Sequence, residues 1–234
     1  MRRRGKPARL PAARNGEEGK MAFRFLGMPV LAGLAALTLA ACGSPGGGYD
    51  NLMAEREVAG AQRDAFSICH GHGCRLRSEA GLTELEWVPV ADLFAEAAPD
   101  ARIERGRIAM AIGILESAVG RKTGTASDRG GTFNAMSGND QFDCYDETTN
   151  TSVYLTLLAR TGYLKWHRLE GWAGRGALID GAWPHQTAVV VEIASGHAYA
   201  VDSWFEDNGR AAHVVPLEEW RAGWRPAGFS DSIL

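Results

Sequence analysis

The chain has 234 residues, of which 45% are hydrophobic and 23% charged, and its formal net charge at pH 7 is -3. This slightly negative balance, with Lys and Arg scattered along the chain, excludes the basic surface that nucleic-acid binding needs. The length suffices for one domain that buries a core without disulfides or metals to hold it together.

The first predicted element is a signal peptide over residues 1–41. After Arg24 comes an apolar run that is too short to span a bilayer, and the tripeptide Leu-Ala-Ala stands directly before Cys42. This pattern resembles a bacterial lipoprotein signal. Cleavage would leave Cys42 as a lipidated N-terminus, whose acyl chains anchor the protein to a membrane. The alternatives are a simple secretory signal or an uncleaved anchor.

The segments on either side of the signal complete the domain organisation. Residues 1–20 are basic and are explained by a misassigned start, because Met21 begins a more ordinary signal peptide. Residues 42–50 form a Gly-rich tether after the lipidated cysteine. Gly43 does not indicate retention in the inner membrane, so we expect an outer-membrane lipoprotein facing the periplasm. Residues 51–234 are then a single domain, expected to be monomeric.

The exported part keeps three cysteines, an odd number. Cys69 and Cys74 are close enough in sequence to join into a small loop in an oxidising compartment, which leaves Cys144 without a partner. His70 and His72 between the pair also admit a zinc site, and free thiols are a third possibility. Because no second ligand pair stands at a recognised spacing, we predict a disulfide between Cys69 and Cys74, and solvent-exposed loop positions for both histidines.

The first half of the domain contains three predicted elements. Residues 52–68 have a helical pattern, and residues 82–90 show the partial alternation of a short strand or extended segment. In residues 101–119 apolar side chains recur at helical spacing, and Gly120 follows as a predicted stop.

A long irregular loop and a second helix occupy the middle of the domain. Residues 122–140 are rich in Gly, Ser, Thr, Asn and Asp, and long loops inside compact domains are usually functional or disordered. Residues 147–160 carry an apolar stripe at helical spacing that ends at Gly162.

The last third changes to strand periodicity. Residues 188–193 are largely apolar and β-branched, and a Ser-Gly turn separates them from a second strand at residues 198–204. The pair predicts a hairpin. Residues 213–215 favour a third strand and residues 217–224 a short terminal helix.

Three residues could carry chemistry together. Cys144 stands between the irregular loop and a helix, and a helix N-terminus favours an ionised thiol. His185 precedes the first hairpin strand and Asp202 lies near the end of the second, so an antiparallel pairing brings the two together. The alternatives are a cysteine that only packs, a turn histidine and a loop-capping aspartate. His197 is a rival base at the far end of the hairpin.

These motifs resemble the bacterial transglutaminase-like cysteine proteinases. They are Asp-Cys-Tyr-Asp at 143–146, His-Gln-Thr-Ala-Val at 185–189 and Val-Asp-Ser at 201–203, within a stretch of about residues 130–210. The resemblance implies an α+β fold in which a papain/transglutaminase-like core combines N-terminal helices with an antiparallel sheet.

The same resemblance implies a role for each residue. Cys144 would attack an amide carbonyl, His185 would move the proton, and Asp202 would fix the imidazole tautomer. Tyr145 stands where that family tends to carry an acidic residue that helps to bind calcium, and we expect no cofactor. An oxyanion hole would use the Cys144 backbone N–H and the side-chain amide of Gln141.

Asn139 and Asn134 are weaker candidates for the same amide donor. The expected function is cleavage of an amide bond in a protein or peptide substrate, or acyl transfer to an amine. The alternatives are a cell-wall peptidase or amidase of the Cys-His type and a non-catalytic binding or scaffold lipoprotein. Trp183, Trp204, Trp220 and Trp224 are expected to be core or cleft-wall residues.

Overall fold

Helices and antiparallel strands form an α+β fold, as expected. The computed structural model describes residues 48–58, 60–132, 138–176 and 184–229. In chain order the elements are α1 (Tyr49–Glu55), β1 (Phe66–His70), β2 (Leu76–Ala80), α2 (Glu84–Leu93), α3 (Ala101–Thr123), α4 (Cys144–Arg160), β3 (His167–Arg175), β4 (His185–Glu192), β5 (Ala198–Asp202), β6 (His213–Pro216) and α5 (Leu217–Arg221).

The strands form two antiparallel sheets. One sheet has the order β3-β4-β5-β6, and the other is the hairpin of β1 and β2. The predicted hairpin of β4 and β5 is confirmed, with a register that runs from Ala188 opposite Val201 to Val191 opposite Ala198. The predicted third strand and terminal helix are also confirmed, as β6 and α5.

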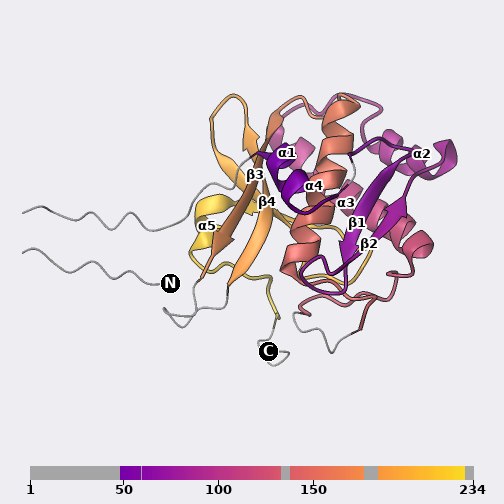
Figure 1. Cartoon of the computed structure of the whole chain (residues 1–234). Coiled ribbons are helices and arrows are strands. Elements are labelled where there is room, and N and C mark those ends of the chain that lie inside the picture. The colour runs from indigo at the N-terminus through magenta and orange to yellow at the C-terminus, as the bar shows by residue number, and fades with distance from the viewer. Residues whose placement is uncertain (1–47, 59, 133–137, 177–183, 230–234) are drawn as a thin grey trace, which may run out of the picture. The chain divides into compact units, whose positions relative to one another are not determined.

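Helix α4 is the centre of the fold. It lies between the four-stranded sheet and the hairpin of β1 and β2, and it contacts β4, β1, β3, α1 and α3 (Figure 1). Every residue from Asp146 to Leu158 is buried, including a run of Thr, Asn and Ser. Because polar side chains inside a core must find hydrogen-bond partners, the position of α4 is fixed by specific contacts as well as by apolar packing.

Helix α3 extends beyond its predicted end. Asp100 caps its start by accepting a hydrogen bond from the backbone N–H of Ile103 at 2.7 Å, and Gly124 ends it with a φ of 77°. The prediction that Gly120 stops this helix is wrong. A Cβ atom at Gly120 would lie 3.0 Å from the Cα of Ala126, so this glycine allows close packing inside the helix.

Two other predicted elements are wrong. A helix was predicted for residues 52–68, but α1 ends at Glu55. Residues 66–68 belong instead to strand β1, which pairs with β2. The strand predicted for residues 82–90 is helix α2, which begins with a capping box between Thr83 and Glu86.

Parts of the expected organisation lie outside the described residues, namely the signal peptide, Cys42 and most of the tether. Within the described ranges, none of the helices has the length and hydropathy that crossing a membrane would require.

Candidate functional site

Cys144 is the first residue of α4. The side chain of Asp143 caps this helix by accepting hydrogen bonds from the backbone N–H groups of Tyr145 at 3.0 Å and Asp146 at 2.9 Å. Asp146 accepts in return from the backbone N–H of Asp143 at 3.3 Å, which completes a capping box. The acidic residues around Cys144 therefore define where the helix begins, and they place the thiol in its first turn.

His185 and Asp202 are in contact. His185 opens β4, Asp202 ends β5, and the His185 Nε2 lies 2.7 Å from the Asp202 Oδ2. The same carboxylate oxygen accepts a hydrogen bond from the indole of Trp220 at 2.7 Å. Burial alone would raise the pKa of Asp202, but the imidazole and the two side-chain hydrogen bonds outweigh it and hold this pKa below its usual value. Asp202 is therefore a carboxylate, which can only accept, so the ring donates through Nε2.

Aromatic rings enclose the imidazole of His185. The ring centroids of Trp204, Phe205 and Trp220 lie 4.6, 5.4 and 5.4 Å from it. Trp204 and Trp220 thus have the wall position expected for them, whereas Trp183 lies outside the described residues. The remaining ring nitrogen of His185, Nδ1, is buried, and no described residue forms a hydrogen bond with it. In a neutral ring with its proton on Nε2, Nδ1 carries the lone pair that a base needs.

The Cys144 thiol is partly exposed and lies against the start of β4. Burial raises the pKa of this thiol to about 12, although a hydrogen bond from the backbone of Gln186 and the charge of Arg56 act to lower it, and Asp143 and Asp202 raise it further. Since Nδ1 has no hydrogen-bond partner, the thiol and the imidazole of His185 are not hydrogen-bonded to each other. The thiol is therefore neutral in this state.

The side chain of Gln141 serves the preceding loop. Its Nε2 donates to the Ser127 carbonyl at 3.0 Å and to Asp140 at 3.3 Å, and its Oε1 accepts from the Arg129 backbone at 3.0 Å. The side-chain amide expected to complete an oxyanion hole is thus engaged elsewhere.

Asn139, a weaker oxyanion candidate, and His197, the rival base, do not join the contact between His185 and Asp202. Asn139 accepts a hydrogen bond from Arg75 through its side chain at 2.9 Å, and Asn134 lies outside the described residues. His197 is exposed beside the turn between β4 and β5, at the far end of β5 from Asp202.

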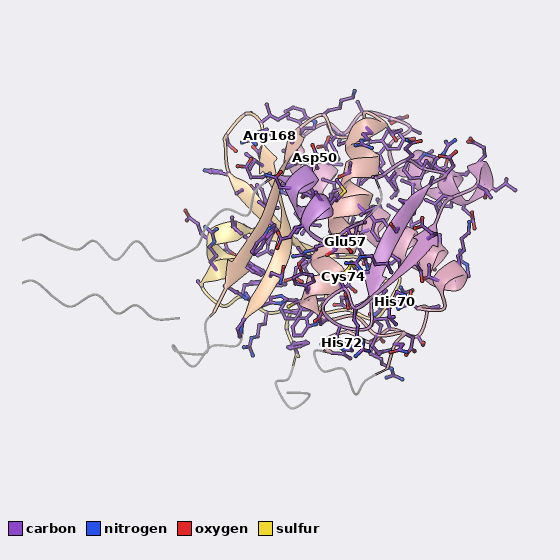
Figure 2. The ribbon with its side chains drawn as sticks, viewed as in Figure 1. Asp50, Glu57, His70, His72, Cys74 and Arg168 are labelled. Carbon is purple, nitrogen blue, oxygen red and sulfur yellow. A yellow bond between two sulfur atoms is a disulfide. The ribbon has the colours of Figure 1, made fainter. Side chains whose placement is uncertain are left out.

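A disulfide-closed loop covers the start of α4. Cys69 and Cys74 form the predicted disulfide, and this loop donates backbone hydrogen bonds to the capping carboxylates. Asp146 accepts from His72 at 2.8 Å and from Cys74 at 2.6 Å, while Gly73 donates to Asp143 at 2.9 Å. Figure 2 shows His70, His72 and Cys74 at this turn, beside α4.

This loop does not fit a metal site. The ligand atoms of Cys69, Cys74 and Asp146 lie within 4.8 Å of one another, but the two sulfurs are bonded to each other and the carboxylate already accepts backbone N–H groups. Backbone N–H donors stabilise the acidic residues next to the thiol. His72 is not the exposed residue we expected, because both of its ring nitrogens are buried and no described residue forms a hydrogen bond with them. His70 is the last residue of strand β1 and not an exposed loop residue.

Reducing the disulfide is expected to lower the melting temperature. Closing so short a loop removes entropy worth about 2 kcal/mol from the unfolded chain. In a domain of this size, each kcal/mol of lost stability lowers the melting temperature by about 2–4 °C. Thermal unfolding with and without dithiothreitol should therefore differ by about 4–8 °C. The Cys69→Ser/Cys74→Ser variant should melt at the lower temperature in both conditions, and equal melting of the oxidised and reduced protein would contradict the expected stabilisation.

Buried carboxyl groups lie beneath the site. Glu147 accepts a hydrogen bond from Ser203 at 2.6 Å, and Ser203 also contacts Thr151 at 3.0 Å. Burial is the largest cause that raises the pKa of Glu147 to about 8 and that of Asp128 to about 9, and each is raised further by neighbouring carboxylates. These groups hold protons at neutral pH, so the interior next to Asp202 carries less negative charge than its composition implies.

The sequence did not indicate that Arg56 belongs to the site, that Trp220 donates to Asp202, or that Gln186 lies beside the thiol. Each of these contacts joins separate segments of the chain, so no local pattern predicts it. Comparison with protein-family models, with curated proteins and with solved structures found no significant match.

Proposed function

We propose that this chain is a thiol enzyme that acts on amide bonds through Cys144, His185 and Asp202. The observation that carries the proposal is the state of the His185 ring. A buried carboxylate contacts Nε2, and no described residue forms a hydrogen bond with Nδ1. In the neutral ring, Nδ1 is therefore available to take a proton. The next residue, Gln186, lies beside the thiol. A helix-borne thiol followed by a histidine and an aspartate on adjacent strands supports a transglutaminase-like core.

The neutral thiol determines the order of the chemical steps. His185 Nδ1 takes the Cys144 proton as the sulfur attacks the amide carbonyl, so no thiolate needs to exist beforehand. The thiol–imidazole hydrogen bond missing from the free state would form when substrate binds, as catalytic hydrogen bonds often tighten in the complex. The carbonyl oxygen becomes an oxyanion, and the Cys144 backbone N–H, in the first turn of α4 where no intrahelical acceptor exists, can donate to it.

The second half of the reaction returns the proton. The imidazolium gives its Nδ1 proton to the leaving amine, which leaves an acyl group on the sulfur as a thioester. Water or a second amine then attacks that thioester, with His185 again removing the proton. The C–S bond breaks, and the imidazolium returns the proton to the Cys144 sulfur. The same residues therefore support hydrolysis and acyl transfer, and the choice depends on which nucleophile reaches the thioester.

The pH dependence of Cys144 alkylation tests this proposal. The full-length chain with Cys42→Ser would be treated with iodoacetamide from pH 6 to 10, and modification of Cys144 followed by mass spectrometry. Transfer of the thiol proton to His185 as the sulfur attacks should give the wild type a rate plateau near neutral pH. His185→Ala should lose the plateau, and its rate should rise about tenfold per pH unit because the thiol ionises with a pKa of about 12. Identical profiles for the two proteins would contradict the proposal.

The raised thiol pKa supports a second candidate, a binding or scaffold module that keeps the same fold without catalysis. A neutral, partly exposed cysteine that makes no hydrogen bond to the nearby imidazole is what such a module would contain. The alkylation experiment separates the two, because a module without catalysis should show no plateau that depends on His185.

We further propose that the protein is a lipoprotein anchored through Cys42 to the outer membrane and facing the periplasm. The support is the apolar run and the Leu-Ala-Ala-Cys sequence that ends it. Replacing Cys42 by Ser should remove metabolic labelling by palmitate and release the protein from the membrane fraction of a bacterial host. Continued palmitate labelling of Cys42→Ser would contradict lipidation at this residue.

A further inference from the structure

Arg56 joins the two elements that carry the proposed catalytic residues. It follows α1, and only 3% of it is exposed. Its Nη1 donates to the carbonyl of Tyr145 at 2.7 Å and to the hydroxyl of Thr149, both on α4. Its Nη2 donates to the side chain of Gln186 on β4 at 2.6 Å. One rigid guanidinium thus bridges the helix and the strand.

The partners of Arg56 are the chain neighbours of the reacting groups. Tyr145 follows Cys144, and Gln186 follows His185. The backbone of Gln186 also acts to lower the pKa of the Cys144 thiol, so the side chain that Arg56 holds belongs to a residue beside the thiol. The guanidinium carbon lies 3.5 Å from the centroid of the Tyr145 ring, which fixes its plane as well as its position.

Among the described residues, no carboxylate forms an ion pair with Arg56. Its hydrogen bonds go to a carbonyl, a hydroxyl and an amide. Its Nε is buried, and no described residue accepts a hydrogen bond from it. A buried charge with neutral partners costs free energy that a neutral side chain would avoid. A function that needs the forked geometry of arginine accounts for keeping it.

We propose that Arg56 is a positioning residue that sets the approach of Cys144 to His185 by holding Tyr145 and Gln186 at a fixed separation. This inference rests on the proposed function, because it assigns Arg56 to the same thiol–imidazole pair. Misplacing reacting groups by about 1 Å can cost on the order of 100-fold in rate. Loss of the bridge is therefore expected to affect the pair strongly while the fold persists.

The test measures the part of Cys144 alkylation that depends on His185, again in the full-length chain with Cys42→Ser. This part is the rate at pH 7.5 minus the rate of His185→Ala. In Arg56→Met it should fall at least tenfold. Arg56→Lys should show a similar loss, because an ammonium keeps the charge but cannot present the same fork to helix and strand. Gln186→Leu removes the acceptor on the strand, and its His185-dependent rate should also fall at least tenfold. This variant tests the bridge even if Arg56→Met does not fold.

Arg160→Gln is the matched control. Arg160 is at the other end of α4 and donates to the carbonyl of Ala61 at 2.9 Å, so it also ties the N-terminal segment to this helix but away from the thiol. Its variant should keep the His185-dependent rate within twofold. An unchanged His185-dependent rate in Arg56→Met, or a wild-type rate in Arg56→Lys, would overturn the positioning role while leaving the proposed function intact. Equal rates in the wild type and His185→Ala would overturn both.

Discussion

Replacing Asp202 by Asn is expected to slow cleavage of an unfolded protein substrate by about 10³–10⁴-fold. Asp202 accepts the Nε2 proton of His185, which leaves the lone pair on Nδ1. An asparagine amide can instead donate to Nε2, which moves the ring proton to Nδ1, and the ring can then no longer take a proton from Cys144. Release of fluorescent peptides from fluorescein-labelled casein, by the full-length chain with Cys42→Ser, would measure the effect.

Two further variants make this result specific. Cys144→Ala should abolish casein cleavage, and Asp207→Asn should change it less than twofold because Asp207 is exposed and accepts from the backbone of Gly130 at 3.0 Å. Adding dansylcadaverine separates the two outcomes of the thioester, since acyl transfer would label the casein with the amine. A rate for Asp202→Asn within threefold of the wild type would show that Asp202 does not control the tautomer.

The contact between His185 and Asp202 follows from local sequence signals. The β-branched run of β4, the turn after it and the period of β5 predict an antiparallel hairpin, and such a hairpin brings the start of one strand to the end of the next. The structure places the His185 and Asp202 side chains 2.7 Å apart. The position of Cys144 at a helix start follows in the same way from a polar loop that meets a helical pattern.

The remaining parts of the site depend on contacts between distant segments. Trp220 reaches Asp202 from α5, and the loop closed by Cys69 and Cys74 reaches the cap of α4 from a hairpin that the sequence did not indicate. Strand β3 was also missed. Alternation and composition describe only which residues can share a face, whereas tertiary packing selects the neighbours.

The sequence also could not show that the thiol is neutral. The helix N-terminus was expected to favour an ionised Cys144, but burial opposes ionisation and the nearby acidic residues oppose it further. Asp143 and Asp202 raise the thiol pKa, because a negative charge disfavours another one nearby. The geometry therefore favours proton transfer to His185 at the moment of attack over a standing thiolate.

The buried carboxyl groups beneath the site are expected to make the protein less stable as pH rises from about 5 to 9. Glu147 has a pKa of about 8 in the folded protein, above its usual 4.5, and Asp128 has one of about 9, above its usual 3.8. Between the two values of each group the folded state binds more protons than the unfolded state. The stability these groups contribute is complete below their unfolded pKa values and is lost as pH rises through the folded ones.

Glu147→Gln should remove part of this pH dependence, because its side chain keeps a carbonyl that can accept from Ser203 but never ionises. At pH 9 the variant should melt above the wild type, with each kcal/mol of stability worth about 2–4 °C, whereas at pH 4.5 the two should melt within about 2 °C of each other. Thermal unfolding followed by circular dichroism at both pH values measures the difference. Glu96→Gln, at an exposed position, is the control and should follow the wild type at both. An equal shift at both pH values would show that Gln acts through packing, and no shift at pH 9 would show that Glu147 is already ionised without cost to the fold.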